Sequence, residues 1–171
     1  WALSGSGTSA NPYVINTVND WNTAATKQQY YYNGNNYVYI KLGANLDFTN
    51  KTFNIYGLSA SGLATARMIR FDGQGHTISG ITISKSNSNE VAALFGGLSA
   101  GGSISHLTVA NSSFQAYRYV AGIVADNGGT VSDCHVASTV TLKVGYTYCG
   151  GIVARNYAPK SLDRKSGSAG M

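Results

Sequence analysis

The sequence has 171 residues, a length typical of one domain, and 43% of them are hydrophobic while only 11% are charged. Its net charge of +5 is spread thinly along the chain, which argues against a nucleic-acid-binding protein. No apolar run reaches the roughly 18 residues of a membrane-spanning helix, so we expect no insertion into a membrane.

The N-terminal part, residues 1–29, predicts an entry strand and a capping helix. Residues 11–15 (NPYVI) are typical of a short strand that follows a proline. Thr17 then precedes Asp20 by three residues, and this spacing is that of a capping box at a helix N-terminus. We therefore predict a helix over about 18–29 that covers the open first coil of a repeated structure.

From residue 30 onward, short β-branched or aromatic segments alternate with Gly, Asn, Asp and Ser, which is typical of strands and turns. Residues 68–83 predict two strands around a tight turn at Asp72 and Gly73. Residues 59–66 are small and predict a protruding loop. Further strands are expected at 37–42, 45–48 and 52–55.

The second half of the chain contains internal repeats. Residues 117–127 (YRYVAGIVADN) return as residues 146–156 (YTYCGGIVARN) at a constant offset of 29, and a looser copy begins at Ala93. Residues 101–109 match residues 128–136 at an offset of 27. Repetition at a fixed period of about 20 to 50 residues indicates a solenoid, in which each unit buries its apolar face against its neighbours.

These patterns predict an all-β fold, a single-stranded parallel β-helix with coils of about 29 residues. Its repeats are expected near 93–121 and 122–150, with a partial copy from 151, within a β-helix that spans 30–156. Residues 157–171 lack strand alternation and predict a flexible tail. Because the chain starts at Trp1 without Met, we expect a mature or excised fragment of a longer exported protein.

Two cysteines and three histidines are the candidate metal ligands. Cys134 and Cys149 align with Leu107 and Val120 in the preceding copies, so we expect two small buried hydrophobic residues rather than a disulfide. The histidines do not share a spacing that would bring three ligands together. We expect no metal site and no cofactor.

Parallel β-helices also carry polysaccharide lyases and hydrolases, whose chemistry needs paired carboxylates or an acidic cluster with a base. We expect Asp126 to form a structural contact with Arg155, its counterpart one coil later, and we assign no catalytic residue. Convergence of Asp72, Asp126 or Asp133 with a histidine or arginine in a cleft would instead favour an enzyme. The other acids before the tail are Asp20, Asp47 and Glu90.

The chain has 12 tyrosines, and four of them recur at the repeat period. Tyr117 and Tyr146 are 29 residues apart, as are Tyr119 and Tyr148, so each pair is expected to stack on adjacent coils. If the rings point outward, they form with Arg118 a platform for a sugar or a protein partner. If they point inward, they fill the coil. These five residues are the candidate ligand-binding site.

Three segments carry a resemblance to a known family. Residues 71–83 (FDGQGHTISGITI), 93–96 (ALFG) and 128–136 (GGTVSDCHV) resemble the GLUG-motif repeats of bacterial surface proteins, and the resemblance covers about 5–156. It implies a right-handed parallel β-helix of the kind found in exported adhesins and as a non-catalytic region beside immunoglobulin-A-cleaving metallopeptidases. The family supplies no defined catalytic residues.

The main functional prediction is a non-catalytic extracellular or cell-surface module for binding or adhesion. Its partner is expected to be a glycan or a host or cell-surface protein, bound along one face of the β-helix. The alternatives are a polysaccharide lyase or hydrolase and a passive stalk segment of a larger surface protein. The open C-terminal coil is a candidate surface for homo-oligomerisation.

Overall fold

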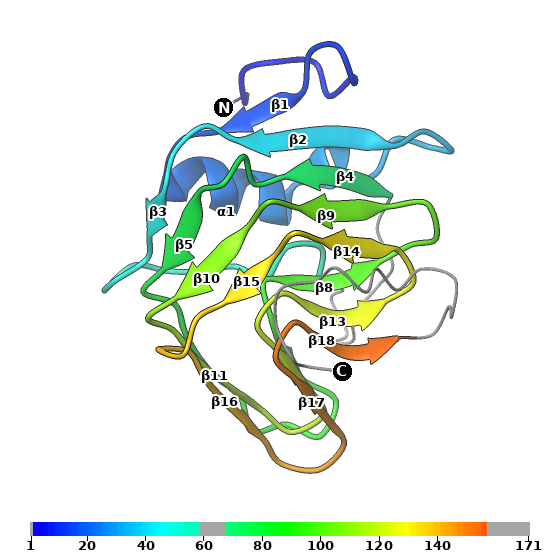
Figure 1. The fold of residues 1–171 in the computed structure, drawn as a ribbon. Helices are drawn as coiled ribbons and strands as arrows, with labels where there is room; N and C mark the ends of the chain where they lie inside the picture. Colours follow the sequence, from blue (N-terminus) through cyan, green and yellow to red (C-terminus); the bar gives the residue numbers. More distant parts are fainter. Residues whose placement is uncertain (1, 59–67, 157–171) are drawn as a thin grey trace.

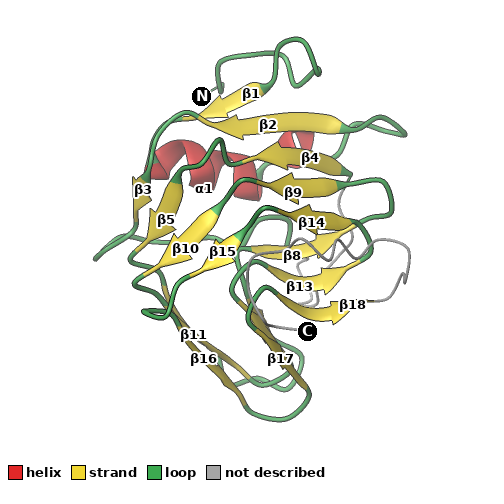
Figure 2. Cartoon of the chain, viewed as in Figure 1, coloured by secondary structure: helices red, strands yellow, loops and turns green. Residues whose placement is uncertain are grey.

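A computed structural model describes residues 2–58 and 68–156 of the chain. The fold is a β-solenoid of about five turns with one short α-helix near the N-terminus (Figure 1, Figure 2). The predicted parallel β-helix and its N-terminal helix are therefore confirmed. The loop predicted at 59–66 and the tail predicted at 157–171 lie outside the described residues.

Strands from successive turns line up in five parallel sheets, which we number I to V in the order in which the chain passes through them. Sheet I contains β1 (Tyr13–Ile15), β2 (Val38–Leu42), β4 (Ile69–Asp72), β9 (Ser103–Ser105) and β14 (Thr130–Ser132). Sheet II contains β3 (Leu46–Asp47), β5 (Thr77–Ser79), β10 (Thr108–Ala110) and β15 (His135–Val136). Sheet III contains β6 (Thr82–Ser84), β11 (Ser113–Ala116) and β16 (Thr141–Val144).

Two further sheets complete each turn. Sheet IV contains β7 (Val91–Ala92), β12 (Tyr119–Ala121) and β17 (Tyr148–Gly150). Sheet V contains β8 (Phe95–Leu98), β13 (Val124–Asn127) and β18 (Val153–Asn156). The strands β4–β8, β9–β13 and β14–β18 thus form three full turns that each pass through all five sheets.

The register between turns follows the offsets in the sequence. Tyr119 pairs with Tyr148, 29 residues later, whereas Thr108 pairs with His135, 27 residues later. The two additional residues are taken up at the corners between sheets, where no ladder has to be maintained. Side chains at equivalent positions therefore stack one above the other along the solenoid.

Residues 68–83 differ from the prediction. They form three strands, β4, β5 and β6, which belong to three different sheets and pair in parallel with strands of other turns. At the first corner Asp72 Oδ1 accepts the N–H of Gln74 at 2.8 Å, and Gln74 has a φ of 51°. The turn therefore redirects the chain into the next sheet and does not reverse it into a hairpin. Residues 52–55 form no strand either, and the adjacent Tyr56 makes an isolated bridge with Phe95.

The helix α1 (Val18–Thr26) begins where the sequence predicts it. Thr17 Oγ1 accepts the N–H of Asp20 at 3.0 Å, and the Asp20 carboxylate accepts the N–H groups of Asn16 and Thr17, so the capping box is confirmed. The α-helix ends three residues earlier than predicted, and the 3-10 turn η1 (Gln28–Tyr30) follows it.

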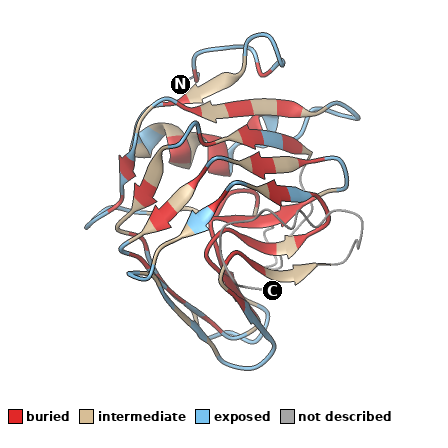
Figure 3. Cartoon of the chain, in the orientation of Figure 1, coloured by how far each residue is buried: buried red, intermediate tan, exposed pale blue. Residues whose placement is uncertain are grey.

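Trp21 joins this helix to the core of the solenoid. Its side chain is fully buried, and its Nε1 donates a hydrogen bond of 2.9 Å to the carbonyl of Asn54. Five aromatic rings surround it at centroid distances of 5.5 to 6.4 Å: those of Phe48, Phe53, Tyr56, Phe71 and Phe95. Alternating residues of the strands point toward the same core, as in β2, where Val38, Ile40 and Leu42 are buried (Figure 3). The helix lies behind β2 and β4 in Figure 1 and covers the N-terminal end of the core.

Candidate ligand-binding surface

Tyr117 and Tyr146 lie at the corner between sheets III and IV, at the bottom of Figure 1. Their rings stack with centroids 5.7 Å apart and an interplanar angle of 10°, and the N–H of Tyr146 donates to the carbonyl of Tyr117. Tyr117 is 38% exposed and Tyr146 is 76% exposed. Because each ring covers one face of the other, the exposed surface of this pair is mainly the outer face of Tyr146.

The second tyrosine pair has a different environment. The rings of Tyr119 and Tyr148 are 5.4 Å apart, but Tyr119 is only 4% exposed while Tyr148 is 44% exposed. Tyr119 does not fill the main core, since its neighbour Val120 occupies that side of the strand. Tyr119 packs instead in a second apolar cluster, which comprises Val91, Ala93, Tyr119, Ala121 and Ala125. Three of the four repeating tyrosines are therefore exposed.

Two arginines hold Tyr119 in place. The guanidinium carbon of Arg118 lies 4.8 Å from the ring centroid, and that of Arg155 lies 5.2 Å from it. Arg155 also donates two hydrogen bonds, of 2.7 and 2.8 Å, to the carboxylate of Asp126. These hydrogen bonds raise the pKa of the Arg155 guanidinium above its ordinary value. The predicted contact between Asp126 and Arg155 is confirmed, and it supports the packing of Tyr119.

The two cysteines are free thiols, as predicted, but only one is buried. Cys134 is 1% exposed, whereas Cys149 is exposed although its counterpart Val120 is completely buried. The prediction for Cys149 is wrong because β17 is the last strand of sheet IV in the described part of the chain, so no further turn covers it there. Partial burial still raises the pKa of the Cys149 thiol.

An acidic cluster with one histidine lies at the corner between sheets I and II. His106 Nδ1 is 3.3 Å from Asp72 Oδ1, and His106 Nε2 is 3.7 Å from Asp133 Oδ2. All three side chains are at least half exposed, so they do not form the desolvated cleft that acid–base catalysis usually uses. Among the residues described, no three His, Cys, Asp or Glu side chains are placed to hold a metal ion.

Sheet III presents an exposed polar face next to the tyrosine corner. Two ladders of stacked side chains run across its three strands, and all six residues are exposed. The ladders are Thr82, Ser113 and Thr141, and Ser84, Gln115 and Lys143. The alternation within Ser113–Ala116 and Thr141–Val144 carries this signal, but sequence reasoning attended to the tyrosines and missed it.

A hollow of about 240 Å³ connects the polar ladders to the tyrosines. Gln115, Tyr117 and Lys143 contribute to its lining, together with residues 84–86 and the backbone around Gly145. Such a volume suits a single small group, because sites for drug-sized ligands are usually ~300–1,000 Å³. The hollow therefore brings an aromatic ring, an amide and a cation together at one place.

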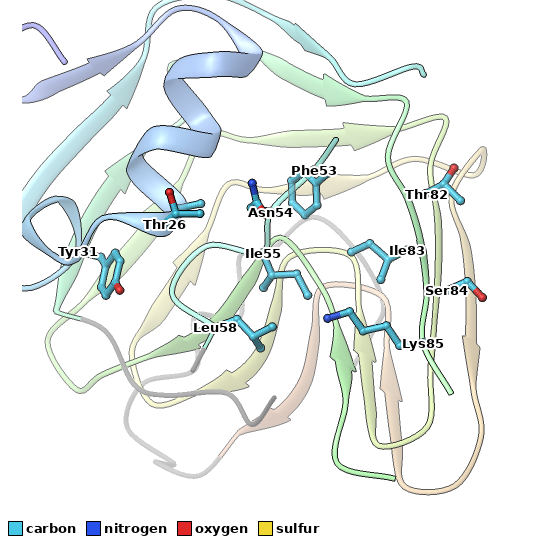
Figure 4. A pocket seen from close by; sticks show the side chains of 11 residues that line it. Thr26, Tyr31, Phe53, Asn54, Ile55, Leu58, Thr82, Ile83, Ser84 and Lys85 are labelled. Atoms are coloured by element: carbon cyan, nitrogen blue, oxygen red, sulfur yellow. The ribbon is translucent and has the colours of Figure 1, made fainter. Parts of the chain in front are cut away.

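A larger cavity of about 650 Å³ lies between the end of α1, the segment 53–55 with Leu58, and β6. Figure 4 shows Lys85 directed toward Ile55 and Leu58 across this cavity. Lys85 also lines the smaller hollow, but its side chain extends away from the tyrosine pair. Lys143 is consequently the cation that belongs to the tyrosine corner.

No protein-family model matches the chain. Over 160 residues the sequence is 30% identical to halomucin from Haloquadratum walsbyi, an alignment that covers 87% of this chain and 2% of halomucin. The fold is similar to that of a Bacteroides ovatus protein described as a candidate immunoglobulin A1 protease, with a TM-score of 0.59. That similarity covers 89% of this chain and 55% of the other at 20% identity, so it shows the fold alone.

These comparisons agree with the β-solenoid fold and with a weak similarity to the two named proteins, whereas the GLUG motif itself is not identified by them. The chain spans only a small part of halomucin and about half of the solved structure. No α-helix within residues 2–58 and 68–156 has the length and apolar composition needed to cross a membrane.

Proposed function

We propose that this chain is a non-catalytic glycan-binding module of an extracellular or cell-surface protein. The observation that carries the proposal is the stacked pair of Tyr117 and Tyr146, which leaves one ring face of Tyr146 open to solvent. The flat apolar faces of sugar rings pack on such aromatic surfaces, while polar neighbours bind their hydroxyl groups. The exposed ladders of sheet III supply hydroxyl and amide groups beside the rings.

The rigidity of the site supports binding with little loss of conformational entropy. Backbone hydrogen bonds from Gly145 to Ala116 and from Tyr146 to Tyr117 join the two corners that carry the rings. Tyrosine itself has few rotatable bonds, so ordering it on binding costs little. The similarity to a protein named as a mucin supports placement in a surface or exported protein.

The proposal is tested by applying the purified protein to a panel of immobilised neutral and anionic polysaccharides. Retention and newly formed chain ends are measured in the same samples. We expect retention of the wild type without new chain ends. The double variant Tyr117→Ala/Tyr146→Ala should bind about tenfold more weakly, since an aromatic contact contributes ~0.5–1.5 kcal/mol.

Tyr32→Ala is the matched control, because Tyr32 is 47% exposed and lies outside the tyrosine corner. Equal binding by the wild type and the double variant would remove the tyrosine site. New chain ends would assign the protein to the carbohydrate-active enzymes and direct attention to Asp72, His106 and Asp133. Absence of retention on every polysaccharide would reject the glycan proposal in favour of a protein partner or a stalk.

A further inference from the structure

The distribution of charge around the tyrosine corner is one-sided. None of the six strands of sheets III and IV contains an aspartate or glutamate. The corners between them contain one carboxylate, that of Glu90, which accepts the backbone N–H of Asn87 at 3.0 Å. The same region contains three cations, Lys85, Arg118 and Lys143.

The acidic side chains of the solenoid lie on other faces. Asp72 and Asp133 are at the corner between sheets I and II, and Asp126 is in sheet V, where Arg155 binds it. An anion that approaches the tyrosine corner therefore meets cations without a nearby repelling carboxylate. A surface of one sign of charge favours ligands of the opposite sign, both in encounter rate and in choice of partner.

Of the three cations, Lys143 is the one whose charge is available at the site. Arg118 lies over the ring of Tyr119, and Lys85 extends into the larger cavity (Figure 4). Lys143 is exposed on β16, and within the described residues its ammonium makes no ion pair. It lines the same hollow as Gln115 and Tyr117.

We propose, building on the glycan-binding function above, that the bound sugar is anionic and that Lys143 recognises its carboxylate or sulfate group. The sugar ring packs on the open face of Tyr146, and its charged group enters the hollow beside Tyr117. Gln115, directly opposite Lys143 in the ladder, offers an amide N–H to a second oxygen of the same group. The exposed hydroxyls of sheet III bind the next sugar along the chain.

The experiment uses hyaluronan, polygalacturonate, chondroitin sulfate and dextran sulfate, each beside its carboxyl-reduced or desulfated form. Dissociation constants are measured for the wild type, Lys143→Gln, Tyr146→Ala and Lys51→Gln. Lys51→Gln is the matched control, since it removes the same charge from an exposed lysine elsewhere on the surface. Thermal unfolding of each variant confirms that the fold is retained.

The wild type should prefer at least one anionic polymer over its neutralised form by about fivefold or more, as expected for one exposed charge contact of about 1 kcal/mol. Lys143→Gln should remove this preference and Lys51→Gln should keep it. Preference for the carboxylated or for the sulfated polymers identifies the anion.

Two results would overturn the inference while leaving the proposed function intact. The first is equal binding of charged and neutral forms that is lost in Tyr146→Ala, and the second is a charge preference that persists in Lys143→Gln. Absence of binding to all polymers, charged and neutral, would overturn both proposals together.

Discussion

Replacing Trp21 by alanine tests whether the N-terminal helix is part of the cooperative core. Trp21 is fully buried among five aromatic rings, so its removal leaves a large cavity that rigid neighbours cannot fill. Substitutions of this type cost about 3–5 kcal/mol, and the carbonyl of Asn54 also loses its donor at about 1–3 kcal/mol. Because these contributions overlap, we expect a decrease of about 5 kcal/mol in the free energy of unfolding.

The decrease is large compared with the total stability of about 5–15 kcal/mol that is usual for a domain. At this chain length each kcal/mol corresponds to about 2–4 °C, so the melting temperature should fall by roughly 10–20 °C. Thermal and guanidinium unfolding followed by far-ultraviolet circular dichroism measure the change. Near-ultraviolet circular dichroism shows whether helix and solenoid unfold together.

Trp21→Phe is the control variant, because it keeps an aromatic ring in the cluster and loses only the indole N–H and part of the volume. Its cost should be about 1–2 kcal/mol. If Trp21→Ala melts within about 3 °C of the wild type, the helix does not contribute to the cooperative core. The assignment of α1 as the cap of the solenoid would then be wrong.

Two further predictions concern the second tyrosine pair and the last turn. Asp126→Asn should destabilise the protein by about 1–2 kcal/mol, because Arg155 is partly exposed and the loss of its charged partner is partly screened; an equal loss in Asp126→Asn/Arg155→Gln would confirm the pair, and additive losses would contradict it. In the native protein iodoacetamide should alkylate Cys149 and leave Cys134 unmodified, with the pH midpoint of the reaction above the ordinary thiol pKa of about 8.5. Because the folded state keeps the Cys149 proton to a higher pH than the unfolded chain, this thiol's contribution to stability is complete below about pH 8.5 and is lost as the pH rises through its folded pKa. A midpoint at or below that of a free cysteine would contradict the assigned environment.

The contacts between turns could be predicted from the sequence because a solenoid stacks equivalent positions directly. The offset of 29 places Asp126 beside Arg155 and Tyr117 beside Tyr146, and both contacts are present. The capping box could be predicted because it depends only on Thr17, Asp20 and the local backbone. Such features require the period of the repeat or a few adjacent residues, and no knowledge of the angles between sheets.

The angles at the corners decided what the repeat period leaves open. Tyr117 and Tyr119 lie on neighbouring positions of the same outer surface, yet only Tyr119 is covered, because it packs in the second apolar cluster beside sheets IV and V. His106 meets Asp72 as well as the predicted neighbour Asp133, since the corner between sheets I and II brings three turns together.

The sequence by itself therefore determined the solenoid, its period, the helical cap and the identity of the stacked residues, because these depend on local and periodic patterns. The tertiary structure decided which stacked residues are exposed, as it did for Cys149 and Lys143. Exposure depends on how sheets fold against one another and on whether a further turn covers a strand. Those contacts join segments that no repeat or motif relates in the sequence.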